Sequence, residues 1–318
     1  MKRLVFAFLA LFTLAATAQN YPAQSLRMIV AFPPGGGADI AARIVAMELG
    51  RELGQSVVVE NVGGAGGQIG AQRAASAAPD GYTVFLGTPS THGTNPAVYP
   101  KLSYDPVKDF APIVLLGSSP FMLITRADMK ASNVKELIAE AKARGGQMNY
   151  ASYGNGSINH LIGELFFSMA DIKAVHVPYK GGAPAMADLM AGRVDFTFDG
   201  SAALGPIRQG KAKVLAVGSP KRWSVLPDVP TVSEAGVPGF EAFTWYALFA
   251  PAATPKPIID VLNAKANAAL KSESAKDQFA KQSIDPIGGT PAQLAAHVQN
   301  EIGKWVKVAK AKNITIAQ

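Results

Sequence analysis

Short apolar runs and amphipathic stretches alternate along most of the chain. Runs rich in β-branched and aromatic residues, such as residues 26–32 and 82–88, are typical of strands, and stretches of helical period, such as residues 38–53, follow them. This alternation predicts an α/β protein built around a mostly parallel sheet. The expected strands lie within residues 26–32, 56–62, 82–88, 110–128, 148–157, 173–182, 195–200 and 212–219, and the expected helices within residues 38–53, 68–78, 133–146, 158–172, 183–194, 257–282 and 290–313.

Two stretches predict that the chain crosses between two lobes. Residues 115–125 and 236–255 are extended in pattern, interrupted by Gly or Pro, and apolar enough to run between packed bodies. The first contains two apolar runs that we expect to be joined through residues 117–120. A chain of 318 residues is long for one core and sufficient for two lobes. We therefore expect a discontinuous first lobe with an inserted second one: residues 21–122 and 245–318 form lobe 1, and residues 123–244 form lobe 2.

The N-terminus predicts export. Lys2 and Arg3 precede an apolar run over residues 4–16, and the small residues Ala16 and Ala18 flank Thr17. This order is that of a secretory signal peptide, residues 1–18, with cleavage after about Ala18. The apolar run is too short for a membrane anchor.

Composition and charge exclude several classes of function. The formal net charge is +7, but the basic residues are scattered and form no patch of the kind that binds nucleic acid. A mild positive field suits anionic ligands. The chain has no cysteine, so it has no thiol nucleophile, disulfide or thiolate metal site, and its four histidines lack metal-ligand spacing. We expect neither a metal nor a cofactor.

Three glycine-rich loops each precede an expected helix: Phe32–Asp39, Gly63–Gly70 and Ser152–His160. Free N–H groups and the helix dipole favour an anion at such a position, and glycine lets a ligand approach the backbone closely. The nucleotide signatures are incomplete, because the third glycine of G-x-G-x-x-G and the lysine of a P-loop are both missing.

The candidates for catalysis are few. Ser90 and His92 are two residues apart in a polar loop, and we expect them to order the turn rather than to form a catalytic pair. No G-x-S-x-G motif of a serine nucleophile occurs. Asp39 is expected to cap its helix. Asp199 follows a strand and is placed at the cleft, where it either contacts a ligand or braces a loop.

With nucleotide binding and catalysis disfavoured, the remaining interpretation is that backbone N–H groups bind a small carboxylate between two lobes. The strand-end hydroxyl groups that we expect to serve as donors are those of Thr88, Ser90, Ser152 and Ser157. The candidate apolar walls are Phe32, Tyr153, Tyr179, Trp245 and Tyr246, for each of which core packing is the alternative. None of the three loops contains Arg or Lys. Backbone N–H groups rather than a salt bridge are therefore expected to hold the carboxylate, with Lys180 as the nearest exception.

A resemblance to a known family rests on motifs that occur in order along nearly the whole chain. They include "AFPPGGGAD", "VVVENVGGAGGQIG", "APDGYTVFLGTPSTHGTNP", "YGNGSINHLIGE" and "VPYKGGAPAMADLMAGRVDFTFD". The chain resembles the substrate-binding receptors of tripartite tricarboxylate transporters, the Bug or TctC-like proteins. The resemblance implies a type II periplasmic-binding-protein fold, in which two α/β lobes close over a ligand in the cleft between them. It also implies a periplasmic, Gram-negative location, a di- or tricarboxylate, acidic amino acid or aromatic acid as ligand, and delivery to permease subunits in the membrane.

The residues and the resemblance together predict a site without a catalytic role. The expected ligand-binding residues are Phe32, Pro33, Gly35, Gly36, Gln68, Thr88, Ser90, Ser152, Tyr153, Asn155, Gly156, Ser157, His160, Tyr179 and Asp199. We expect a monomer. The alternatives are a sensor that docks on a two-component kinase, an exported enzyme on the same fold, and the effector domain of a transcription regulator, which would need a helix-turn-helix where the export signal stands.

Overall fold

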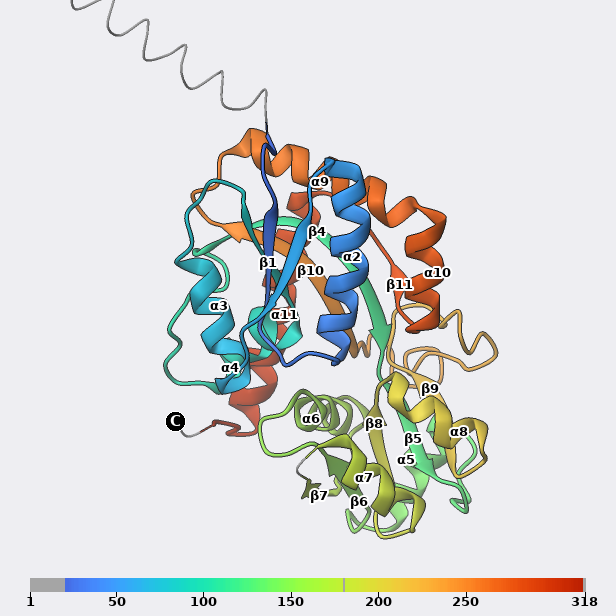
Figure 1. Ribbon diagram of the computed structural model, residues 1–318. Helices are drawn as coiled ribbons and strands as arrows, with labels where there is room; N and C mark the ends of the chain where they lie inside the picture. Colours follow the sequence, from blue (N-terminus) through green and yellow to red (C-terminus); the bar gives the residue numbers. More distant parts are fainter. Residues whose placement is uncertain (1–20, 180, 317–318) are drawn as a thin grey trace, which may run out of the picture.

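The structure, a computed structural model, describes residues 21–179 and 181–316. The expected signal peptide, residues 1–18, and Lys180 lie outside the described residues. Figure 1 shows two bodies, each with its own sheet, joined where the chain passes from one to the other. We call the body that begins and ends the described chain lobe 1 and the other lobe 2.

Lobe 1 contains a six-stranded sheet in the order β11-β4-β10-β3-β1-β2. Its strands are β1 (Leu26–Val30), β2 (Val57–Asn61), β3 (Thr83–Gly87), β4 (Phe110–Pro120), β10 (Phe243–Pro251) and β11 (Asp285–Pro286). Its helices are α2 (Gly37–Leu53), α3 (Gln68–Ala75), α4 (Asn95–Val98), α9 (Lys256–Lys271), α10 (Glu273–Lys281) and α11 (Pro291–Ala311). Strands β2, β1 and β3 are parallel, and β10 runs antiparallel to β3 and β4.

Both faces of this sheet are covered by helices. Alternate residues point to opposite faces of the sheet, so Met28 and Val30 of β1 cluster with α2 and α9, whereas Ile29 and the following Ala31 cluster with α3 and α11. This double burial explains why the strand sequences are continuous apolar runs rather than alternating ones. The arrangement leaves the ends of the strands free to form a site.

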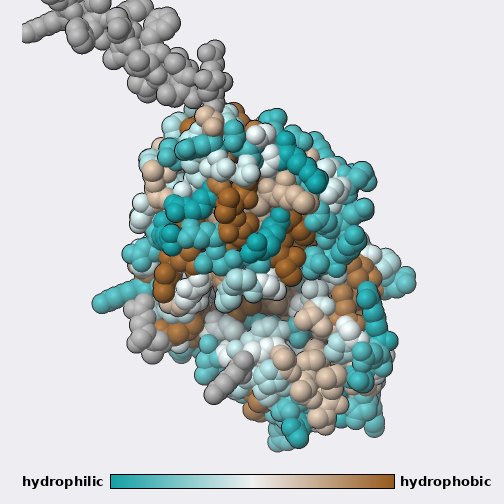
Figure 2. Space-filling model, in the orientation of Figure 1, coloured by the Kyte–Doolittle hydropathy of each residue, from teal (hydrophilic) through white to brown (hydrophobic). Residues whose placement is uncertain are grey.

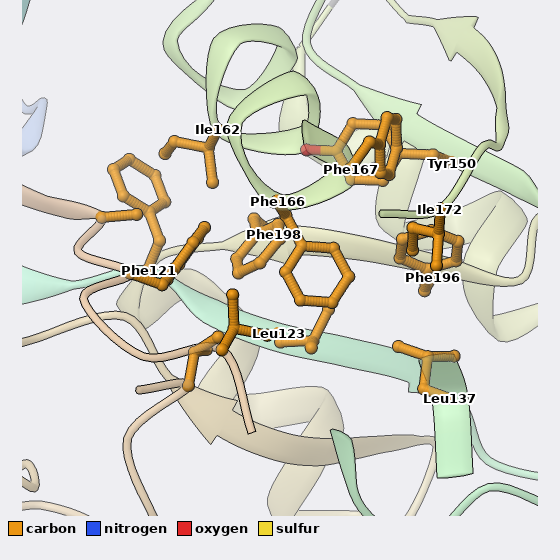
Figure 3. Packing of buried hydrophobic residues seen from close by; sticks show 14 of the residues in the cluster. Phe121, Leu123, Leu137, Tyr150, Ile162, Phe166, Phe167, Ile172, Phe196 and Phe198 are labelled. Atoms are coloured by element: carbon orange, nitrogen blue, oxygen red, sulfur yellow. The ribbon is translucent and has the colours of Figure 1, made fainter. Parts of the chain in front are cut away.

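Lobe 2 contains a five-stranded sheet in the order β7-β6-β8-β5-β9. Its strands are β5 (Met122–Arg126), β6 (Asn149–Ser152), β7 (Val175–Pro178), β8 (Phe196–Asp199) and β9 (Ala212–Val217). Its helices are α5 (Val134–Ala143), α6 (Ile158–Ala170), α7 (Gly182–Met190) and α8 (Leu204–Arg208). Figure 3 shows aromatic side chains of α6 and the sheet facing one another. The ring centroids of Phe166 and Phe198 are 5.5 Å apart.

The first crossing between the lobes is shorter than the sequence suggested. Residues 117–120 do not join two runs; they are the end of β4, paired with β10 and β11. The sheet of lobe 1 supplies hydrogen-bond partners to this backbone, so the strand continues to Pro120 and only Phe121 separates it from β5. The second crossing, between β9 and β10, leads back into the middle of the lobe 1 sheet.

Helix α11 contacts both lobes. Leu294 and Val298 in its first half pack in the core of lobe 1, whereas Trp305 and Val308 in its second half belong to the core cluster of lobe 2. Lys312, just beyond the helix, pairs with Glu164 of α6 at 2.9 Å. No helix in the described part of the chain is long and apolar enough to cross a membrane.

Candidate ligand-binding site

The carboxyl ends of four strands meet at the boundary between the lobes. Phe32 follows β1 and Thr88 follows β3 in lobe 1, while Tyr153 follows β6 and Asp199 ends β8 in lobe 2. In open α/β sheets, ligands bind outside the carboxyl ends of the strands. Figure 2 shows the surface hollowed at this boundary.

Two neighbouring cavities make up the hollow, and we call them the proximal and the distal cavity. The proximal cavity, about 580 Å³, is lined by Phe32, Pro33, Pro34, Gly35, Gly36, Gly37, Ala38, Thr88, Pro89, Ser90, Phe121, Ile158, Thr244 and Tyr246. The distal cavity, about 590 Å³, is lined by Gly37, Ile40, Ser119, Phe121, Tyr153, Asp199, Gly200, Ser201, Ala202, Leu204, Arg208, Thr244, Tyr246, Lys281, Gln282, Ser283 and Ile284. The two cavities adjoin, because both are lined by Gly37, Phe121, Thr244 and Tyr246, and we call them together the cleft.

The loop after β1 is held by Asp39. Its carboxylate accepts hydrogen bonds from the Gly35 N–H at 2.9 Å, the Asn61 amide at 2.9 Å and the Arg43 guanidinium at 3.0 Å. The hydrogen bond from Arg43 is the main cause that lowers the pKa of Asp39 to about 2. Asp39 is therefore not the N-cap, a position that Gly36 occupies; it fixes the loop from inside the first helical turn.

The start of α2 presents backbone N–H groups to the proximal cavity. The first helical hydrogen bond joins the Ile40 N–H to the Gly36 carbonyl, so the N–H groups of Gly37 and Ala38 have no partner within the helix. Gly37 also lies against Tyr246, because a Cβ at this position would be 2.7 Å from the tyrosine hydroxyl oxygen. The helix end thus favours an anion where the backbone is most accessible.

The loop after β3 contributes Thr88 and Ser90 to the same cavity. The Thr88 side chain is buried and its Oγ1 has no hydrogen-bond partner among the described residues. His92 turns away from Ser90 and stacks on Phe249 with ring centroids 4.0 Å apart. Burial lowers the pKa of His92 to about 3. Ser90 and His92 therefore form no catalytic pair.

The second glycine-rich loop packs behind the first. A Cβ at Gly70 would lie 2.7 Å from the Cα of Ala31, so α3 approaches β1 more closely than a larger residue allows. Gln68 is buried at the start of α3 and does not line either cavity. In this loop Gly70 therefore serves helix–strand packing, whereas Gly64, Gly66 and Gly67 have positive φ and serve the turn that precedes α3.

The third glycine-rich loop uses most of its polar groups internally. Ser157 caps α6 by accepting the His160 N–H at 3.2 Å, and Ser152 contacts the ring of His176 at 2.6 Å. The His160 ring accepts the Gly156 N–H at 3.1 Å. The cavities are lined by Tyr153 and Ile158 from this segment, but not by the predicted Ser152, Asn155, Gly156, Ser157 and His160.

Tyr153 and Asp199 face each other in the distal cavity. The Tyr153 hydroxyl and the Gly200 N–H both donate to the Asp199 carboxylate. Burial raises the pKa of Asp199 to about 6, and these two hydrogen bonds offset part of the effect. The predicted Tyr179 lies elsewhere and donates to Asp188 at 2.8 Å.

Several lining residues escaped the sequence analysis. Tyr246, predicted as one of several possible apolar walls, lines both cavities. The neighbouring candidate Trp245 is instead a core residue, and its indole N–H donates a hydrogen bond to Glu301. Phe121, Thr244 and the distal residues near Arg208 and Lys281 carry no local motif. They reach the cleft because the crossings and α10 are folded against it, so only the pairing of distant segments reveals them.

The fold and the cleft define the class of this protein: it is a two-lobed solute-binding receptor of the periplasmic-binding-protein type. The chain belongs to the TctC family, the tripartite tricarboxylate transporter family receptors, over residues 41–314. Protein BugT of Bordetella pertussis is 38% identical over 296 residues, which span 92% of this chain and 91% of BugT. Relatives of this family are periplasmic receptors and not enzymes.

Two solved structures of similar proteins hold carboxylates. R. palustris Rpa4515 with adipate is 38% identical, with a TM-score of 0.78 over 93% of this chain and 100% of that chain. MatC (Rpa3494) from Rhodopseudomonas palustris with bound malate is 36% identical, with a TM-score of 0.73 over 91% of this chain and 99% of that chain.

Proposed function

We propose that this protein is an exported periplasmic receptor that captures a small carboxylate in the cleft and delivers it to the permease subunits of a tripartite tricarboxylate transporter. The observation that carries the proposal is the proximal cavity, where the first N–H groups of α2 and the unpartnered Thr88 hydroxyl converge. Donors of this kind satisfy a carboxylate without a cation. The adipate and malate of the two similar structures belong to the same chemical class.

The predicted residues divide into two groups by their position. We propose that Phe32, Pro33, Gly35, Gly36, Thr88, Ser90, Tyr153 and Asp199, which line the cleft, contact the ligand. We propose that Gln68, Ser152, Asn155, Gly156, Ser157, His160 and Tyr179 act indirectly, by shaping the loops that carry the contact residues. Phe121, Thr244 and Tyr246 join the first group because they line both cavities.

The test is a thermal-shift and mass-spectrometry experiment on the purified protein. We expect di-, tri- or aromatic carboxylates to raise the melting temperature in proportion to the logarithm of their concentration, because they bind only the folded state. Native mass spectrometry should show the same class of ligand retained from the cell. Stabilisation by neutral sugars or amines, with none by carboxylates, would contradict the proposal.

Delivery requires its own test. Proteoliposomes that contain the permease subunits of a tripartite tricarboxylate transporter from the same organism should accumulate the radiolabelled ligand only when the loaded receptor is added. Equal uptake with and without the receptor would show that binding serves a purpose other than transport.

A further inference from the structure

The distal cavity differs from the proximal one in its chemistry. The proximal walls include Phe32, Pro33, Pro89 and Ile158, whereas the distal cavity has carboxyl, amide and cationic side chains beside its apolar ones. Tyr246 and Phe121 lie between the two, because they line both. A ligand that fills the cleft therefore passes from backbone donors, along aromatic rings, to a polar end.

Two cations face the distal cavity from opposite lobes. Arg208 is the last residue of α8 in lobe 2, and Lys281 is the last residue of α10 in lobe 1. Both side chains are exposed, and neither forms an ion pair or hydrogen bond with another described residue. Ser283, in a left-handed conformation with φ of 58°, turns the chain after α10 and places residues 281–284 at the cleft.

An unpartnered hydroxyl lies at the same end. Ser119 is 4% exposed, lines the distal cavity, and its Oγ has no hydrogen-bond partner among the described residues. A buried hydroxyl without a partner is costly, so a ligand or solvent group belongs there. Ser119 is opposite Thr244 in the β4–β10 ladder, which places this hydroxyl beside the boundary of the two cavities.

The acid in the distal cavity does not cancel the two cations. Asp199 is 4% exposed, and its Oδ1 atom accepts hydrogen bonds from the Tyr153 hydroxyl and the Gly200 N–H. With Arg208 and Lys281 charged, the cavity carries a net positive charge whether or not Asp199 is ionised. This balance favours an anionic group at the distal end.

We propose, on the basis of the proposed function, that the distal cavity binds a second carboxylate of the ligand, and that Arg208 and Lys281 recognise it from opposite lobes. The ligand class is then an extended dicarboxylate, with one carboxylate at the start of α2 and the other near Ser119. Because both cations line this cavity from opposite lobes, an anion bound between them attracts both when the lobes close. The distal carboxylate thus couples recognition to closure.

Calorimetry with matched pairs of straight-chain acids tests the inference on the full chain. The pairs are succinate with butyrate, glutarate with pentanoate, and adipate with hexanoate, at pH 7.5 and constant ionic strength. We expect one dicarboxylate to bind at least about tenfold more tightly than its monocarboxylate. Arg208→Met and Lys281→Met should each weaken that dicarboxylate by about tenfold and change the monocarboxylate by less than about twofold.

Lys271→Met is the matched control. Lys271 is an exposed lysine at the end of a helix, α9, but it does not line the cleft. It should leave both affinities unchanged. Equal weakening of both acids by all three substitutions, or equal binding of both acids by the wild type, would overturn the inference and leave the proposed function standing. Failure of every carboxylate to bind would overturn both.

Discussion

The Tyr153 hydroxyl donates a hydrogen bond to the Asp199 carboxylate, and this contact joins the ends of two strands of lobe 2 at the cleft. Tyr153 follows β6 and Asp199 ends β8, strands that pair in parallel. The contact braces the loop that opens α6 and at the same time holds an acid in the distal cavity. The two roles considered for Asp199 from sequence, ligand contact and loop brace, are therefore compatible.

The pH dependence of stability should reveal the buried Asp199. Burial raises its pKa from 3.8 to about 6, so between these values the folded state holds a proton that the unfolded state has lost. The free energy of unfolding then falls as the pH rises through this window, by at most about 3 kcal/mol. Urea denaturation of wild type and Asp199→Asn at pH 4, 5, 6 and 7 measures the difference. A difference independent of pH would show that Asp199 titrates normally.

Gly36→Val should block the proximal cavity without unfolding the protein. Gly36 has φ of −80° and ψ of 166°, which valine adopts readily, and its Cβ would be 3.7 Å from the nearest atom, the Pro33 carbonyl oxygen. The added side chain would occupy the space of the ligand carboxylate, so we expect affinity to fall by about tenfold or more. Gly303→Val, on the exposed face of α11, is the control. Calorimetry measures binding and thermal denaturation confirms the fold; unchanged affinity in Gly36→Val would place the carboxylate elsewhere.

Asp39→Asn should loosen the loop after β1. The substitution removes the negative charge that holds Arg43. It also replaces one of the two carboxylate oxygens by an NH2 group, so either the Gly35 N–H or the Asn61 amide loses its acceptor. We expect a loss of about 1–3 kcal/mol in the free energy of unfolding, together with weaker ligand binding. Arg73→Ala, which breaks only a partly exposed ion pair with Glu60, should change stability by less than about 1 kcal/mol. Equal effects of the two substitutions would mean that the Asp39 network does not organise the site.

Ligand binding should bring the lobes together. The cleft lies between the lobes, and Phe121 alone separates β4 from β5 at the first crossing, so a few residues can act as a hinge. Small-angle X-ray scattering should show a smaller radius of gyration with saturating ligand than without it. Helix α11 packs in the cores of both lobes, so we expect these contacts to restrict the amplitude of the motion. An identical scattering profile in both states would indicate a cleft that is already closed.

The sequence by itself determined most of the elements, the class and the family, although the helix expected within residues 257–282 is two helices, α9 and α10. Periodicity is a local property, so the strand within residues 26–32 and the helix within residues 38–53 were predicted close to their observed bounds. The glycine-rich loop between them was correctly taken as an opening onto a helix start, because dihedral freedom and missing N–H partners also follow from local chemistry. The ordered motifs identified the family before any contact was known.

Only the tertiary structure decided which groups meet in the cleft. The three glycine-rich loops look alike in sequence, yet one lines the proximal cavity, one packs α3 against β1, and one satisfies most of its own polar groups. Ser119, Arg208 and Lys281 have no common motif and come together through the pairing of β4 with β10 and the turn after α10. The reason is physical: contacts between segments far apart in the chain depend on how whole sheets and helices pack, and no short stretch of sequence contains that information.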